Sequence, residues 1–227
     1  MKKIICFMLA TVMALMLVGC SFTAILPDGD ANKNDSEVDI PVGDKNAADE
    51  SKKTVSRGTF EGDVYKNDYL GFEFTKPESW MYYTDEEIAA VFNMSAEQMG
   101  EQFEKALENN VSLYDMMVVD MTTGTNINVG YENLVKTLAT NITEAQYIEA
   151  MKKQLATVAG MTVEFPEESE TAKLGDNEYT KCVCTTTVSG ATMTQVYYLR
   201  KVDTYMASII VTIVGGYTVE DIEAMFR

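Results

Sequence analysis

The sequence predicts an α+β domain in which a central, largely antiparallel sheet is flanked by helices. Segments with strand-like patterning follow one another along the chain and are joined by short turn-prone pairs such as Ser189-Gly190 and Val202-Asp203, which favours antiparallel pairing of chain neighbours. Between them lie segments whose apolar residues recur every three or four positions, as on a helix that packs on a sheet. About 170 residues take part, which is enough for one core.

The domain is expected to begin with a hairpin and two helices. Thr59 to Tyr65 and Leu70 to Thr75 have the composition of strands, and Pro77 ends the second one because proline cannot donate to a ladder. Thr84-x-x-Glu87 and Ser95-x-x-Gln98 each form a capping box, the pattern that opens a helix.

The remainder is expected to be mostly strand around one longer helix and a short final one. Thr143-x-x-Gln146 opens the longer helix, along which apolar residues recur from Ile148 to Val158. The final helix is expected at Val219 to Phe226, after Gly215-Gly216. The expected strands are Leu113 to Met121, Asn126 to Tyr131, Thr162 to Phe165, Glu178 to Val188, Thr192 to Lys201 and Tyr205 to Val214.

Two stretches of this domain resemble a known family. The first, Asn67-Asp68-Tyr69-Leu70-Gly71-Phe72-Glu73-Phe74 with the following Pro77-Glu78-Ser79-Trp80, resembles the opening of PsbP/Mog1-like domains, particularly those of Firmicutes lipoproteins. Ile127-Asn128-Val129 and Tyr131-Glu132-Asn133-Leu134 are also similar to that group. The resemblance covers residues 58–227 and implies an α/β/α sandwich, with Trp80 filling a core edge. It implies an adaptor or accessory role and no set of site residues.

The first twenty residues have the pattern of a lipoprotein signal. Two lysines precede an apolar run from Ile4 to Val18, which is shorter than the roughly 20 residues of a membrane span. The run ends in Leu17-Val18-Gly19-Cys20, which resembles the lipobox of bacterial lipoproteins. The resemblance implies cleavage after residue 19 and a diacylglyceryl group on the Cys20 sulfur. Acyl chains such as palmitate would then hold the chain at the extracytoplasmic face of the cell membrane.

Residues 20–57 are expected to be the lipidated cysteine followed by a flexible acidic spacer. From Ser21 to Arg57 the chain is rich in Asp, Asn, Lys, Ser and Gly and poor in aromatic residues, a composition that cannot support a packed core. Asp28 to Asp39 has oxygen-bearing side chains spaced partly as in a calcium loop, but Lys33 occupies the position that needs glycine. We therefore predict neither a metal nor a cofactor.

Charge and composition exclude several classes of function. The net charge is −17 and histidine is absent, so binding to nucleic acid is disfavoured and the commonest acid/base and metal-ligating side chain is missing. The sequence also lacks the G-x-S-x-G and S-x-x-K patterns of serine nucleophiles. The leading expectation is a noncatalytic binding or accessory module whose partner is an envelope protein or polymer. A carboxylate-based hydrolase acting on an envelope polymer is the alternative.

Two further groups of residues are candidate sites. Tyr82, Tyr83, Asp85, Glu86 and Glu87 combine aromatic area with an acidic rim, which suits a basic partner or a carbohydrate; the competing interpretation is an inward-packed tyrosine beside a favourable acidic helix start. Cys182 and Cys184 would face the same side of a strand. They are candidates for soft-metal binding, although burial as core thiols is the favoured interpretation.

Overall fold

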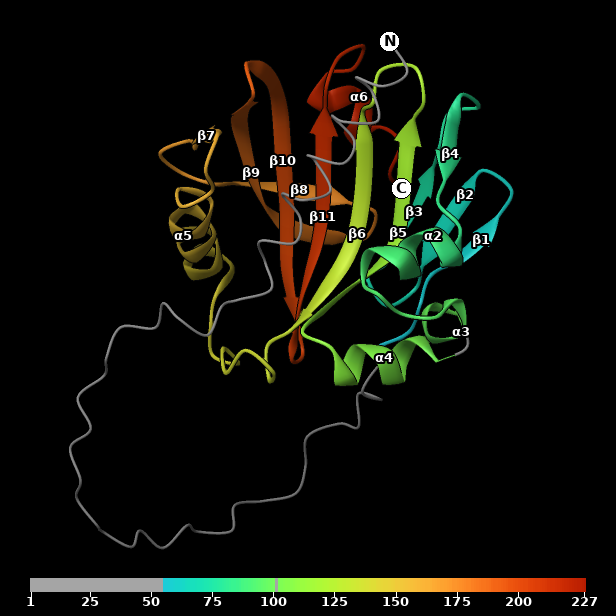
Figure 1. The fold of residues 1–227 in the computed structure, drawn as a ribbon. Coiled ribbons are helices and arrows are strands. Elements are labelled where there is room, and N and C mark those ends of the chain that lie inside the picture. The colour runs from blue at the N-terminus through green and yellow to red at the C-terminus, as the bar shows by residue number, and fades with distance from the viewer. Residues whose placement is uncertain (1–54, 101) are drawn as a thin grey trace, which may run out of the picture.

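The computed structural model describes residues 55–100 and 102–227 (Figure 1). The predicted signal peptide, Cys20 and the spacer as far as residue 54 lie outside the described residues. Val55 is buried and Arg57 forms ion pairs with the domain, so residues 55–57 contact the folded part of the chain. No helix within residues 55–100 and 102–227 is both long and apolar enough to cross a membrane.

The main sheet has eight strands, and every neighbouring pair in it is antiparallel. The strand order is β4-β5-β6-β11-β10-β9-β7, and β8 pairs with β9. The predicted α+β class with a largely antiparallel sheet is therefore confirmed. The strands are β4 (Trp80–Tyr82), β5 (Ser112–Asp120), β6 (Asn126–Asn133), β7 (Met161–Glu164), β8 (Glu170–Leu174), β9 (Asn177–Val188), β10 (Ala191–Val202) and β11 (Tyr205–Ile213).

A second, three-stranded sheet forms at the start of the domain, with β1 (Thr59–Glu61), β2 (Val64–Asn67) and β3 (Phe72–Thr75) in that order. The predicted single strand from Thr59 to Tyr65 was wrong, because it is two strands that pair with each other. Gly62 lies between them with φ +61°, a conformation that glycine adopts at no steric cost and that a tight turn requires.

Three of the described helices begin where their capping residues predict. Thr84, Ser95 and Thr143 each complete a capping box. The region after Ser95 forms two short helices, and their apolar residues Met99, Phe103, Ala106 and Leu107 are buried. The helices are α2 (Asp85–Val91), α3 (Ala96–Met99), α4 (Phe103–Asn109), α5 (Glu144–Leu155) and α6 (Val219–Glu223).

Both faces of the main sheet are covered, which gives the chain its layers (Figure 1). One face packs with the small sheet, α2 to α4 and α6 around a core that includes Phe74, Phe103 and Ile222. The other face packs with α5 through Ile148. Trp80 is 1% exposed and donates from Nε1 to the hydroxyl of Tyr217 at 2.8 Å, so its predicted burial is confirmed.

Candidate functional site

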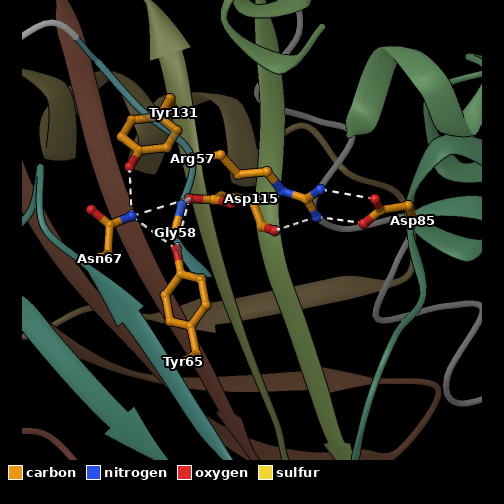
Figure 2. Close-up of polar contacts among 7 residues, drawn as sticks. All are labelled: Arg57, Gly58, Tyr65, Asn67, Asp85, Asp115 and Tyr131. Carbon is orange, nitrogen blue, oxygen red and sulfur yellow. Dashed lines mark hydrogen bonds and ion pairs between the residues drawn. The ribbon is translucent and has the colours of Figure 1, made fainter. Parts of the chain in front are cut away.

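A buried polar network joins the start of the folded domain to the main sheet and to α2. Its centre is Asp115 on β5, and its two ends are Arg57 and the side-chain amide of Asn67 (Figure 2). We call it the Arg57 network. Its members are Arg57, Gly58, Tyr65, Asn67, Asp85, Asp115 and Tyr131.

Asp115 has no solvent exposure and accepts every hydrogen bond that it makes in this network. Its Oδ2 accepts from the backbone N–H of Gly58 at 2.9 Å, the hydroxyl of Tyr65 at 2.7 Å and the amide of Asn67 at 3.0 Å. Its Oδ1 accepts from Nε of Arg57 at 3.3 Å. Because four donors surround it, the carboxyl is held as a carboxylate and the guanidinium supplies the balancing charge.

A β-bulge places Asp115 in this position. The pairing register of β5 and β6 shifts between Tyr114 and Met116, and a bulge re-aims the side chain of its extra residue. Glycine at position 58 lets the backbone N–H reach Asp115 while passing close to Tyr65, since a Cβ on Gly58 would lie 2.3 Å from the ring of Tyr65. The sequence signals for this network were an aspartate inside the otherwise apolar run from Leu113 to Val119 and an arginine just before the first strand.

Arg57 also forms the outer half of the network. Its Nη1 and Nη2 donate to the two carboxylate oxygens of Asp85 at 2.9 and 2.5 Å, a bidentate arrangement that fixes orientation as well as distance. The guanidinium carbon lies 5.8 Å from the ring centroid of Phe103. One side chain therefore ties the chain entry to β5, to the first residue of α2 and to α4.

The electrostatics of the network are those of a structural interaction rather than of a catalytic site. Burial raises the pKa of Asp115, and hydrogen bonds from Tyr65 and Gly58 and the charge of Arg57 oppose that rise. Burial and then the charge of Asp115 raise the pKa of Tyr65 and Tyr131 well above the ordinary range, so both phenols stay protonated. A carboxylate with no exposed surface and a full set of donors leaves no position for a substrate.

The structure brings the predicted partner surface together at the passage from β4 to α2. Asp85, Glu86 and Glu87 form the first turn of α2, where negative charge is favourable. Asp85 is paired with Arg57, Glu87 accepts from the backbone N–H of the capping Thr84, and Glu86 is exposed. Asp85 and Glu87 therefore stabilise the fold, and Glu86 is the acid of this surface that is open to a partner.

The two tyrosines of this surface are half-buried. Tyr82 packs edge-on against Phe60 with ring centroids 5.0 Å apart, and its hydroxyl donates to the carbonyl of Asp63 at 3.1 Å. Phe60 is 42% exposed and belongs to the same surface, although it was not among the residues predicted for that surface. The result is an aromatic edge beside an acidic helix start.

Cys182 and Cys184 lie side by side under α5 on the opposite face of the main sheet. Both are free thiols with 1% exposure, and their sulfurs are 3.6 Å apart, so the favoured burial as core thiols is confirmed. The hydrogen bond between the two thiols and the charge of Lys152 lower the pKa of Cys182, and burial opposes this shift. Hydrogen bonding to Cys182 and burial raise the pKa of Cys184.

Glu132, near the end of β6, is another buried carboxyl. Its Oε2 accepts from the hydroxyl of Tyr147 on α5 at 2.7 Å, whereas its Oε1 is buried and has no hydrogen-bond partner in the described part of the chain. Burial raises the pKa of Glu132, and the hydrogen bond from Tyr147 opposes the rise. Among the described residues, no group of three or more cysteine or acidic side chains is placed to hold a metal ion.

Comparisons with known proteins give a likeness of fold only. No protein-family model matches the chain, and no curated protein matches it. A solved structure similar to it is the solution structure of cyanobacterial PsbP (CyanoP) from Synechocystis sp. PCC 6803, with 13% sequence identity and a TM-score of 0.41 over 75% of this chain and 97% of that chain.

Proposed function

We propose that the chain is a noncatalytic binding or accessory module of the cell envelope, tethered to the membrane through a lipidated Cys20. Its support in the sequence is the convergence of a basic start, a short apolar run and a lipobox at that cysteine. Residues 20–57 would then be the spacer between lipid and domain, at the extracytoplasmic face of the membrane. The partner would be an envelope protein or polymer.

The observation that carries this proposal is the position of Arg57. It is the last residue of the predicted spacer and is bound to Asp85 and Asp115. A domain on a tether needs a firm point of attachment, because any movement of the spacer acts on the first residues that contact the core. Through Asp85, the same side chain holds the first turn of α2, which is part of the candidate partner surface.

Photocrosslinking in native membranes tests the proposal. A benzoylphenylalanine at Glu86, the exposed acid of the candidate surface, is expected to give one or a few discrete adducts with envelope components. The matched control is the same replacement at Thr171, an exposed position on β8, which is expected to give none of them. Identical adducts at both positions would contradict a specific partner surface.

The alternatives have different support in the structure. For the hydrolase, turnover of glycan or peptide substrates that a single Asp or Glu substitution abolishes would displace the binding module. Asp115 and Glu132 are both buried, and no observation of the described residues favours that reaction.

For soft-metal binding, the 3.6 Å separation of the Cys182 and Cys184 sulfurs is favourable, because soft thiolates bind copper(I) and zinc. Stoichiometric metal that is lost in Cys182→Ser, measured on protein purified under reducing conditions, would support it.

A further inference from the structure

The connection between β6 and α5, residues 134–143, differs in charge from the rest of this acidic chain. The whole sequence has 35 acidic residues, yet this segment has none, and its one charged residue is Lys136. Lys136 is exposed. The segment is therefore a small non-acidic region on a molecule whose net charge is −17.

Two large apolar side chains point out of the core in this segment. Leu138 is 77% exposed, more than any other large apolar residue in the described ranges, and Val135 is 51% exposed. The turn that carries them is firmly held: the N–H of Ala139 donates to the carbonyl of Leu134 at 2.8 Å, and the N–H of Val135 donates to Oδ1 of Asn133 at 3.1 Å. A fixed backbone therefore presents both side chains to the outside.

The backbone of Leu138 is in an unfavourable conformation for its side chain. Its φ is +57°, in the left-handed region where glycine and asparagine are common and a branched side chain is an outlier. Leucine at this position thus costs conformational energy and leaves apolar area in water. Such strain is often retained where it serves a function, and burial in the core does not account for this side chain.

The turn lies at the end of the domain where the spacer enters. The side-chain amide of Asn133 donates to the carbonyl of Leu107 in α4 at 3.2 Å, and Arg57 lies against Phe103 of the same helix. Figure 1 shows α4, the yellow connection before α5 and the start of the described chain at one end of the main sheet. A lipid anchor at Cys20 would approach the domain from this end.

We propose that Val135 and Leu138 insert into the membrane surface and thereby orient the domain on its tether. The inference rests on the proposed anchoring at Cys20, which supplies a membrane within reach of the spacer. Two apolar side chains bind a bilayer weakly by themselves, but a tether makes the contact intramolecular, with an effective concentration on the order of millimolar. Lys136 between them suits anionic headgroups, which the rest of the surface would repel.

Depth-dependent fluorescence tests the contact. Residues 20–227, with Cys20→Ser and an N-terminal hexahistidine, are held on phosphatidylcholine and phosphatidylglycerol vesicles that contain a nickel-chelating lipid. Cys182 and Cys184 are 1% exposed, so an environment-sensitive thiol dye labels an introduced cysteine selectively. The dye on Leu138→Cys is expected to emit at shorter wavelength and to lose most of its emission when nitroxide-labelled lipid is included.

Met121 provides the matched control. It is an apolar residue with 55% exposure in the turn between β5 and β6, at the far end of that hairpin from Leu138. The same dye on Met121→Cys is expected to show neither change. Equal quenching at both positions, or no quenching at Leu138, would overturn the proposal. A protein partner at this turn would give the latter result, because the vesicles contain no other protein.

A second variant separates docking from folding. Asparagine tolerates the left-handed conformation, so Leu138→Asn should not lower the thermal unfolding midpoint, yet it should reduce the quenching of a dye on Val135→Cys severalfold. Met121→Asn should leave that quenching unchanged. Unaltered quenching in Leu138→Asn would refute the role of Leu138. Since chelating lipid replaces the acyl chains, this experiment can fail or succeed independently of lipidation at Cys20.

Discussion

Glu132 is a buried carboxyl whose cost to the folded state depends on pH. Burial raises its pKa above the ordinary value of 4.5. As the pH rises above 4.5, the unfolded chain loses this proton before the folded chain does, so this group lowers the free energy of unfolding until the folded-state pKa has been passed. Above that pH the penalty remains, because the folded protein then holds a buried carboxylate with one unpaired oxygen.

Glu132→Gln should remove that penalty. Glutamine keeps an acceptor for the hydroxyl of Tyr147 and carries no charge, so at pH 7 to 8 the variant is expected to gain about 1 kcal/mol relative to the parent, a gain that shrinks towards pH 4. Urea unfolding across this range measures the difference. The control is Glu178→Gln, at an exposed position. A difference that is constant with pH would show that Glu132 does not titrate in this range.

Single residues were predictable where a local rule decides their environment. Trp80 follows a proline that ends a strand and is buried, and Thr84, Ser95 and Thr143 cap helices, because a capping box is written within four residues. The role of Asp115 was not predictable, because it depends on a bulge and on donors more than 45 positions away in sequence. Nothing in the neighbouring sequence reports such contacts.

At the scale of elements, Arg57 holds three separate pieces of the chain. Removing its side chain by Arg57→Ala leaves the carboxylate of Asp115 buried without its counter-charge, which is expected to cost about 2 to 4 kcal/mol of unfolding free energy. Asp85→Ala removes only the outer ion pair, whose acidic partner is 38% exposed, and should cost less than about 1 kcal/mol. Urea unfolding of both variants measures the two costs.

A surface ion pair provides the control for Arg57. Lys66 pairs with Asp68, and both side chains are at least half exposed, so Lys66→Ala should change the unfolding free energy by less than about 0.5 kcal/mol. If Arg57→Ala were no more destabilising than Lys66→Ala, the Arg57 network would not be the attachment point that the proposed function needs.

Elements with strong periodicity were predicted well, whereas two short strands were missed. The long strands β9 to β11 and the helix α5 agree with the expected segments to within a few residues. The strands β4 and β8 have three and five residues, too few to establish a period, and neither was predicted. Strand Thr59 to Tyr65 divides at Gly62 because turn chemistry there outweighs the strand-like composition of its neighbours.

For the whole molecule, the fold class could be predicted from strands that follow one another in sequence and are joined by tight turns. The order of the strands in the sheet could not. Tight turns identify β9, β10 and β11 as consecutive neighbours. The pairing of β11 with β6 joins segments about 80 residues apart, and no local pattern specifies it. The division into a main sheet and a small one is likewise a property of packing, because the small sheet contributes Tyr65, Phe72 and Phe74 to the shared core.

The claim that the chain is a tethered module depends on Cys20, and metabolic labelling with a fatty-acid analogue tests it most directly. The parent chain and Cys6→Ala are expected to incorporate the label, since Cys6 belongs to the predicted signal peptide. Cys20→Ala is expected to incorporate none and to keep the mass of residues 1–19, because cleavage follows lipidation. Labelling of Cys20→Ala at the level of the parent would contradict the account.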